Sequence, residues 1–473
     1  MTPNFFAFFI LFAWPLLMLA AATIIPVRKV VLISILGGNL FLPATGIAIS
    51  GFPNYTKLLA AGLGALLPAF LFAAPKLLSL RPKPLDLFFV GFLIAPAISS
   101  LINGLGPYDA ASTLVNRFLE WGVAYWLGRT LFTDLGALRD ICVAVVVSGM
   151  LYAPLCLYEI RMSPQLSKMI YGFFPASSGW GMTKRMGGWR PTVFMPHGLA
   201  VATWMACSAL VAWILWRAKA VRHIWGIPIA WIAIGLVVVT IGLRSTGAAI
   251  LLVGLIGAAE FIQFSRLRPV LLAMVLVPMG YIGLRSVGWY GHELVDVTQQ
   301  VFGEDRAGSL NMRLENDAII ADKAMQNPLF GWGGWGRWRV KNEFGVDITV
   351  SDSWWAILLG STGFFGLICT YATFISPLIP LSRHKTRTRI FIGPLGAAWA
   401  LGFGVLLFVL DTLFNAMPNT SFMLMSATLV SVLALVSPAA MRRMLAQQQH
   451  AQAEAESDTP QTDGQGQRSP STP

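Results

Sequence analysis

The amino-acid sequence predicts an all-α polytopic membrane protein with about 12–13 transmembrane helices. Of its 473 residues, 56% are apolar and only 12% are charged, whereas a soluble globular protein carries about 25% charged residues. Apolar runs near the length that crosses a bilayer as a helix recur along most of the chain. Trp, Phe, Gly and Pro are frequent, as is typical of spanning helices and membrane interfaces.

The apolar runs give thirteen predicted spans. The first is too long for the apolar core of a signal peptide and follows no basic segment, so we expect a spanning helix there. The fifth is the weakest, because Glu120 and Arg129 interrupt it. The predicted spans cover about residues 4–25, 30–50, 58–75, 85–105, 118–133, 139–158, 197–216, 225–243, 246–264, 269–285, 354–377, 391–411 and 418–437.

Lys and Arg residues in the short connections predict the orientation. If the N-terminus lies outside, every inside connection is basic, from Arg28 and Lys29 in the first to residues 383–389 before the twelfth span. We therefore expect the N-terminus outside and the C-terminus in the cytoplasm. Residues 446–473 have almost no large apolar side chains, which predicts a disordered cytoplasmic tail after a transmembrane domain of residues 1–445.

Charge and cysteine usage argue against two other kinds of site. The net charge of +12 fits basic inside connections, since no polar segment shows a basic stripe interleaved with aromatic residues, and we expect no nucleic-acid partner. The four cysteines lack CxxC spacing, and few His residues occur, so we expect no disulfide framework, no metal site and no cofactor. The cysteines, all in apolar runs, are Cys142, Cys156, Cys207 and Cys369.

Two long connections, about residues 159–196 and 286–353, lie on the outside in this topology. The second contains apolar residues at helical spacing over 310–325, ended by Asn327 and Pro328. We expect an extracytoplasmic helix there, packed on two sides or lying on the membrane surface. The helix carries Arg313, Glu315, Asp317, Asp322 and Lys323. Most of these charges are expected to form a solvated face, and Arg313 is the exception.

The second outside loop continues with the glycine- and tryptophan-rich residues 331–339. Glycines let a backbone approach a ligand closely, and the faces of Trp332 and Trp335, with Arg337 between tryptophans, offer surfaces for sugar rings. An interfacial aromatic belt is an equally good interpretation. Asp352, where the chain enters the next span, is either a helix cap or a functional carboxylate, and the two roles are compatible.

Three further polar residues lie at the outside ends of spans. Arg190 and His197 stand at the mouth of the seventh span, where a snorkelling arginine and an interfacial histidine are alternatives to a functional role. Arg244 occupies the tight turn between the eighth and ninth spans, and a cation there favours function. The sequence contains no HExxH, GxxxxGK[ST] or GxSxG motif.

The order of these features resembles the O-antigen ligase and polymerase superfamily. The similarity covers about residues 187–410 and is carried by order and spacing. Its segments are "RPTVFMPHG", "RSTGA", a loop helix with Arg313 running into "NPLFGWGGWG", and "SDSWWAILLGSTGFFGL". The family's P-x-x-G-x-G stretch corresponds to Pro328, Gly331 and Gly333, and its later Gly-x-x-Gly corresponds to Gly363 and Gly366.

The resemblance implies a metal-independent, membrane-embedded glycosyltransferase of the GT-C type in the bacterial inner membrane, with a periplasmic N-terminus. Its donor would be an oligosaccharide on undecaprenyl diphosphate, its second substrate an acceptor glycan, and a chain-length regulator a further partner. Arg190, Arg244 and Arg313 would bind the diphosphate, because the planar guanidinium matches phosphate oxygens. Asp352 would orient the acceptor hydroxyl or take its proton. Expected sugar or acceptor contacts are His197, Trp332, Trp335 and Arg337.

The residue at position 352 separates two activities within the family. Ligases that attach glycan to lipid A core usually carry His there, whereas Asp is more often found in repeat-unit polymerases, so we favour a polymerase of O-antigen or exopolysaccharide repeats. Ser353 departs from the Asn usual at the next position. A ligase is the alternative. A lipid-linked glycan flippase or secondary transporter would instead place charges at the bilayer midplane, and a membrane scaffold would leave the arginines unexplained.

Overall fold

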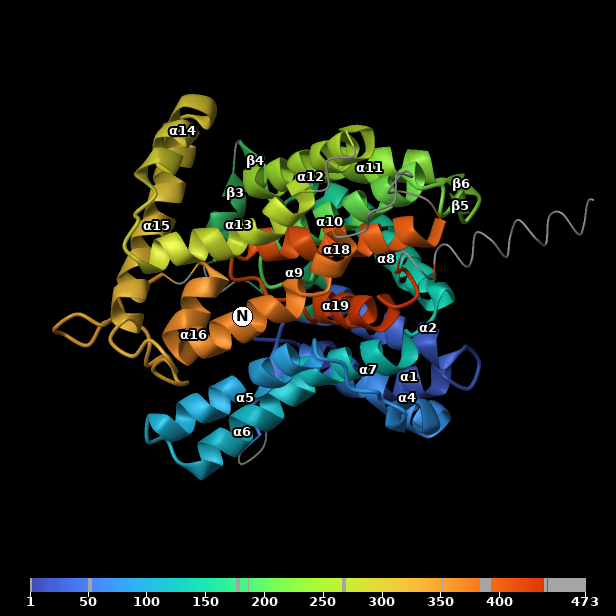
Figure 1. The fold of residues 1–473 in the computed structure, drawn as a ribbon, viewed down its shortest axis with the longest axis horizontal. Coiled ribbons are helices and arrows are strands. Elements are labelled where there is room, and N and C mark those ends of the chain that lie inside the picture. Colours follow the sequence, from blue (N-terminus) through green and yellow to red (C-terminus); the bar gives the residue numbers. More distant parts are fainter. Residues whose placement is uncertain are drawn as a thin grey trace, which may run out of the picture.

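The computed structural model describes residues 2–49, 53–175, 179–185, 187–265, 269–350, 352–382, 393–437 and 440. It is 71% helical with almost no strands (Figure 1), which agrees with the all-α prediction. The predicted tail 446–473 and the basic connection 383–389 lie outside the described residues. Short antiparallel hairpins pair β1 (Gly46–Ile47) with β2 (Tyr55–Thr56), β3 (Lys184–Arg185) with β4 (Gly188–Trp189), and β5 (His223–Ile224) with β6 (Ile227–Pro228).

Helical segments overlap each predicted span, and further helices lie between the spans. They are α1 (Phe5–Ala21), α2 (Val27–Leu32), the π-helical η1 (Ile33–Gly37), α3 (Gly38–Phe41), α4 (Lys57–Leu78), α5 (Asp86–Ile102), α6 (Pro107–Arg117), the π-helical η2 (Phe118–Gly122), α7 (Val123–Leu131), α8 (Leu135–Met162), α9 (Leu166–Tyr171), the 3-10 helix η3 (Trp180–Thr183), α10 (Gly198–Arg217), α11 (Ile229–Gly242), α12 (Thr246–Ser265), α13 (Pro269–Ser286), α14 (His292–Phe302), α15 (Glu304–Ala324), α16 (Trp354–Ile375), α17 (Leu378–Ser382), α18 (Gly393–Asp411) and α19 (Thr420–Val432).

Several of these helices could cross a membrane, as expected for an all-α membrane protein. Within the described residues, α4, α8, α10, α12 and α16 are long and apolar enough to do so by length and composition, and six shorter apolar helices accompany them. The predicted span 30–50 is helical only as far as Phe41. Pro43 explains the early end, because the residue before a proline is driven out of the helical region, and Leu42 is extended.

The core of the bundle surrounds α10. Its side chains are buried on nearly every face, as in a helix enclosed by other helices. It packs against α8, α11, α12 and α18, and Figure 1 shows it among these helices. The indole of Trp204 is buried and donates to Ser148 Oγ of α8 at 3.2 Å. A rigid α10 therefore holds the residues at its N-terminal end in fixed positions.

Arg129, one of the two charges that interrupt the weak fifth span, is accommodated by pairing with Asp86. Arg129 of α7 donates to both carboxylate oxygens of Asp86, from Nε at 2.7 Å and from Nη2 at 2.9 Å. The hydroxyl of Tyr125 adds a third hydrogen bond to Asp86 at 2.7 Å. A buried arginine is tolerated when it has such a two-pronged partner. The pair thus explains how a helix with a charged interior residue fits within the bundle.

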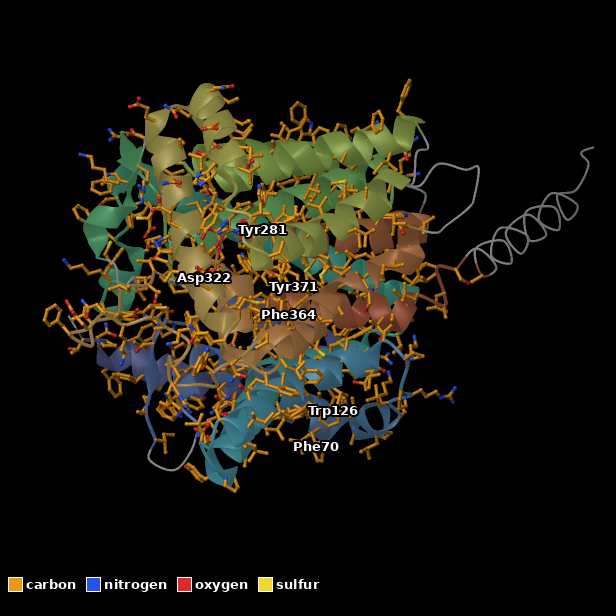
Figure 2. All side chains as sticks on the ribbon, turned by 60° about the vertical axis from the view of Figure 1, so that its left-hand side comes forward. Phe70, Trp126, Tyr281, Asp322, Phe364 and Tyr371 are labelled. Carbon is orange, nitrogen blue, oxygen red and sulfur yellow. The ribbon has the colours of Figure 1, made fainter. Side chains whose placement is uncertain are left out.

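The predicted loop helix exists and is longer than expected. α15 begins at Glu304 and packs against α13, α14 and α16. Asp322 is exposed on it, and Figure 2 shows this residue on α15, outside the bundle in which Tyr281 and Tyr371 lie. The expectation of a solvated charged face fails for Asp317, which is fully buried. The reason is that α15 lies against α16 along the face that carries Asp317.

Candidate active site

Arg313 and Asp352 meet where α15 lies beside the start of α16. The Nε atom of Arg313 is 3.5 Å from Asp352 Oδ2, and the Asp352 side chain is 37% exposed. The Nη1 atom of Arg313 donates to the carbonyl oxygen of Phe414 and to Asn415 Oδ1, both at 3.0 Å. These contacts tie α15 to the segment after α18 and point the guanidinium at Asp352.

Arg190 lies at the same site, reached from the first outside loop. Its side chain is buried, and Nη2 donates to the carbonyl oxygen of Arg244 at 3.1 Å. Burial and the positive charges of Arg185, Arg313 and Arg306 lower the pKa of Arg190 to about 10. Its Nε atom has no hydrogen-bond partner among the described residues. A buried cation surrounded by other cations is an environment that a bound anion would stabilise.

The loop that carries Arg190 is fixed by the end of α8. The buried carboxylate of Glu159 accepts hydrogen bonds from the backbone N–H groups of Thr192 and Val193, each at 2.8 Å, and of Leu166 at 2.9 Å. Gly198 then leaves room for the arginine, because a Cβ atom there would lie 2.6 Å from Arg190 Cγ and Cδ. The sequence therefore provides both the anchor and the space for this side chain.

Arg244 joins the site from the turn between α11 and α12. It has a positive φ of 57°, an uncommon conformation for a residue with a side chain. Its Nη1 atom donates to the carbonyl oxygen of Arg185 at 3.4 Å. Gly188 of β4 makes the approach possible, because a Cβ atom there would overlap the Arg244 guanidinium. The β3–β4 hairpin thus lies directly on this turn.

His197 is the residue before α10 and caps it. Its Nδ1 atom accepts a hydrogen bond from the backbone N–H of Leu199 at 3.1 Å. Burial, together with the charges of Arg190, Arg313 and Arg185, lowers the pKa of His197 to about 4. The imidazole is therefore neutral near pH 7, and with Nδ1 accepting, its proton is on Nε2. His197 can donate a hydrogen bond there without adding to the positive charge.

Two arginines belong to the site that the sequence analysis did not single out. Arg185 lies on β3, and Arg306 lies on α15; both charges act on Arg190. Arg306 stands seven residues before Arg313, which is two helical turns and hence the same face of α15. That spacing could have identified it. We call Arg185, Arg190, Arg244, Arg306 and Arg313 the arginine cluster.

A buried carboxyl, Asp317, lies behind Asp352. Its Oδ2 atom accepts a hydrogen bond from Ser353 Oγ at 2.6 Å, and Oδ1 has no partner among the described residues. Burial raises the pKa of Asp317 to about 7; the charge of Asp352 also raises it, while Ser353 and the nearby cations Arg285 and Arg313 act in the opposite direction. Asp317 thus holds the residue next to Asp352 in place.

Residues 328–333 have a structural role that the sequence analysis did not assign. α16 is broken at Gly363, where φ is 62°, and a break inside an apolar helix releases backbone groups that need partners. Phe364 N donates to the Pro328 carbonyl at 2.8 Å, and Phe365 N to that of Leu329 at 3.1 Å. In return, Trp332 N donates to Gly360 O at 2.9 Å and Gly333 N to Ser361 O at 3.0 Å. We call this interlock the Gly331–Gly363 latch.

The latch explains the glycine spacing of this segment. A Cβ atom on Gly331 would lie 2.6 Å from backbone atoms of Ser361, Thr362 and Gly363. On Gly363, a Cβ atom would overlap the backbone at Leu329. The two backbones pass so closely that only glycine fits at either position. The glycines thus let residues 328–333 lie directly against α16, which is another segment of the same chain.

Of the remaining predicted contact residues, Trp335 and Arg337 lie toward α6 and the α5–α6 connection, whereas Trp332 contacts α15. Trp332 Nε1 donates to the carbonyl of Lys323 at 2.9 Å. Trp335 is 81% exposed, has a positive φ of 60°, and its Nε1 donates to Asp109 Oδ1 at 2.7 Å. Arg337 Nη1 donates to the carbonyl of Asn103 at 3.1 Å. These residues therefore form a second polar-aromatic surface, distinct in its contacts from the arginine cluster.

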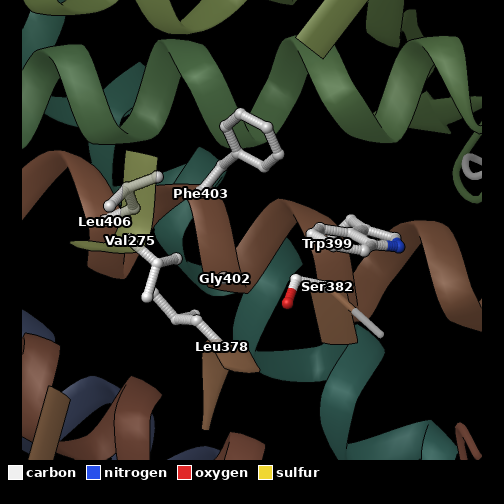
Figure 3. A pocket seen from close by; sticks show the side chains of 7 residues that line it. All are labelled: Val275, Leu378, Ser382, Trp399, Gly402, Phe403 and Leu406. Carbon is white, nitrogen blue, oxygen red and sulfur yellow. The ribbon is translucent and has the colours of Figure 1, made fainter. Parts of the chain in front are cut away.

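Neither a metal site nor a substrate-sized apolar cavity accompanies the arginine cluster in the described part of the chain. No group of three or more His, Cys, Asp and Glu side chains there is arranged to hold a metal ion. An apolar cavity between α13, α17 and α18, of about 10 Å³, is lined by residues including Val275, Leu378 and Phe403 (Figure 3). It lies near the α17 end of α16, away from Asp352, and is too small for a substrate.

Comparison with known proteins does not name a family. No protein-family model matches the chain, and no curated protein matches it.

Proposed function

We propose that this chain is a membrane-embedded glycosyltransferase that moves a glycan from an undecaprenyl diphosphate carrier to the hydroxyl of an acceptor glycan, as a polymerase of O-antigen or exopolysaccharide repeats. The observation that carries the proposal is the arginine cluster beside Asp352. Arginines from the first outside loop, the α11–α12 turn and α15 lie together, although they are far apart in the sequence.

The charge of the site supports an anionic leaving group. The guanidinium of Arg190 is buried and repelled by its neighbours, to the point that its pKa falls to about 10. A diphosphate would supply the missing negative charge, and guanidinium groups bind phosphate oxygens through paired N–H donors. In a reaction without a metal, such preorganised cations would stabilise the charge that develops on the departing diphosphate.

The exposed carboxylate of Asp352 supports the acceptor role. In the proposed step the acceptor hydroxyl oxygen forms a bond to the anomeric carbon, and the bond from that carbon to the diphosphate oxygen breaks. The electron pair leaves with the diphosphate, and the hydroxyl proton passes to Asp352. Arg313, 3.5 Å from Asp352, would orient the carboxylate and contact the diphosphate at once. Neutral His197 would donate a hydrogen bond to a sugar oxygen from Nε2.

The position of the site favours transfer over transport. His197 precedes α10, Arg244 lies between two helices, and Asp352 precedes α16, so the charges stand at helix ends. A secondary transporter or flippase would place its binding residues near the middle of the spans. Trp335, exposed and held by Asp109, would be a stacking surface for the sugar chain. We propose the periplasmic face of the bacterial inner membrane as the place of reaction.

Deletion of the gene, followed by gel analysis of the surface polysaccharide, tests this function. We expect single-repeat product, which defines a polymerase. Bare lipid A core with lipid-linked long chains would instead assign the ligase activity, and repeats held on the cytoplasmic leaflet would assign a flippase. Complementation with Arg313→Ala should fail, whereas Asp322→Asn, an exposed change on the same helix, should restore chains. Unchanged polysaccharide after deletion would refute the glycosyltransferase assignment.

A further inference from the structure

A second charged site lies at the opposite end of α8 from the arginine cluster. Glu159 near the C-terminus of α8 holds the loop that carries Arg190, whereas Asp140 near its N-terminus lines a groove of about 600 Å³. With 28 residues, α8 is roughly 42 Å long, so these sites stand on opposite sides of a bilayer-thick bundle. The groove takes no part in the proposed transfer reaction.

The groove is formed where α4 bends away from α2 and α7. The backbone of Ala73 is not helical, with φ −142° and ψ 23°, and Pro75 two residues later cannot donate the hydrogen bond that a straight helix needs. The bend opens a space beside the start of α2. We call it the Lys29–Lys76 groove; six of its lining residues are Arg28, Lys29, Phe72, Lys76, Leu131 and Asp140.

Two of the three cations in the groove are available to a ligand. Arg28 is already held, because it contacts the carboxylates of Asp134 at 2.5 Å and Asp140 at 3.8 Å and donates to the Leu131 carbonyl. Lys29 and Lys76 are exposed, and neither forms an ion pair within the described ranges. The groove therefore presents two uncompensated ammonium groups over a fixed guanidinium.

The walls of the groove are apolar and continue onto a lipid-like surface. Phe72 is 51% exposed, and its neighbours Phe70 and Leu71 are more exposed still. Figure 2 shows Phe70 at the edge of the bundle. Exposed apolar residues on an apolar helix are suited to acyl chains rather than water. A free phosphate ion would need the lysines but would gain nothing from these walls.

We propose that the Lys29–Lys76 groove binds the anionic headgroup of a phospholipid, with the phosphodiester between the two lysines and an acyl chain along Phe72. Basic pockets between membrane helices bind anionic headgroups in this way, and each nearby lysine contributes about fivefold in affinity. The ligand class follows from the combination of two unpaired lysines and an apolar wall. The proposal is independent of the glycosyltransferase function.

Native mass spectrometry of the purified full-length protein in detergent, titrated with dioleoylphosphatidylglycerol, tests the proposal. We expect tighter binding than for dioleoylphosphatidylcholine. Lys29→Ala/Lys76→Ala should weaken the phosphatidylglycerol complex by about 25-fold, because the two fivefold losses multiply. Lys29→Arg/Lys76→Arg should retain binding. The matched control is Lys219→Ala/Arg222→Ala, which removes two exposed cations outside the groove and should leave binding unchanged.

Three results would overturn the proposal. Equal binding of the two lipids would remove the requirement for an anionic headgroup. An equal loss in the Lys219→Ala/Arg222→Ala control would indicate diffuse surface attraction instead of a groove. Full displacement of the lipid by inorganic phosphate at the lipid's own affinity would assign the groove to a free anion. A normal melting temperature of the Lys29→Ala/Lys76→Ala variant verifies that it is folded.

Discussion

The buried carboxyl of Asp317 makes the stability of this protein depend on pH in a direction opposite to that of most acidic residues. Its pKa is raised from 3.8 to about 7, chiefly by burial, so the folded state holds a proton that the unfolded state releases. Folding is therefore unaffected by this group below about pH 4 and becomes progressively less favourable as pH rises from about 4 to 7. Above pH 7, the difference in pKa lowers the free energy of unfolding by at most about 4 kcal/mol.

Asp317→Asn tests this reasoning, because asparagine keeps the shape and an acceptor for Ser353 Oγ but does not ionise. Asparagine also lowers stability by an amount that does not change with pH, because its N–H₂ group replaces an oxygen that has no hydrogen-bond partner. The difference in stability between the variant and the wild type should therefore move in the variant's favour from pH 4.5 to pH 9, by up to about 3 kcal/mol.

Thermal unfolding in detergent, followed by tryptophan fluorescence at several pH values, measures the effect of Asp317→Asn. Asp322→Asn, exposed on the same helix, is the control and should follow the wild type throughout. If the melting temperatures of wild type and Asp317→Asn change in parallel with pH, Asp317 is ionised or solvated in the folded protein, and its pKa is not raised by burial.

Three further changes probe the site and the latch. Arg313→Ala should lower glycan transfer by about 10²–10³-fold, the effect of losing one preorganised donor to a developing charge, and Arg313→Lys should rescue poorly; normal chain extension in cells would contradict a diphosphate role. Asp352→Asn should reduce turnover more than donor binding, measured with purified protein. Unchanged turnover would remove the proton-accepting role, because the N-cap residue of α16 is Ser353 and Asp352 does not cap the helix. Gly331→Ala should lower the melting temperature, because left-handed backbone alone costs a residue with Cβ about 1–2 kcal/mol and this Cβ would lie 2.6 Å from the α16 backbone. Gly334→Ala, with open space around it, is the control. Equal melting temperatures of the two variants would argue against the latch.

Hydropathy predicted most of the helices, because a spanning helix must be apolar over its whole length. It could not predict where those helices break. η1 within the second predicted span and the break at Gly363 within the eleventh preserve an apolar composition, so no composition-based signal marks them. Pro43, which ends the second helical stretch, is an exception, because a proline in the sequence marks the helix end just before it.

The site was partly predictable. Arg190, Arg313 and Asp352 were selected by their place in the chain, and the structure brings them together. Asp317 was missed, because a charged residue on an amphipathic loop helix is usually solvated, and only tertiary packing of α15 on α16 buries it. Arg185 lies in a short hairpin, and its proximity to Arg244 depends on Gly188, which periodicity does not reveal.

The separation of Arg313 and Asp352 is set by two ties between α15 and α16. Near the site, Asp317 accepts a hydrogen bond from Ser353. Farther along, residues 328–333 interlock with α16 at Gly363. From Asp317 to Pro328 and from Ser353 to Gly363 the chain advances by nearly equal numbers of residues, and α15 supplies the helical part of the first stretch as far as Ala324. The two segments therefore run side by side in the same direction and are fastened at both ends.

This arrangement makes the Gly331–Gly363 latch a remote determinant of the geometry of the candidate site. If Gly331→Ala displaces residues 328–333, α15 can shift along α16, and the 3.5 Å contact between Arg313 and Asp352 is lost although neither residue is changed. Displacements of about 1 Å can reduce catalysis by roughly a hundredfold. We therefore expect Gly331→Ala to lower transfer activity even at temperatures where it remains folded, whereas Gly334→Ala should not. Full activity in a folded Gly331→Ala protein would mean that Asp317 and Ser353 alone position the site.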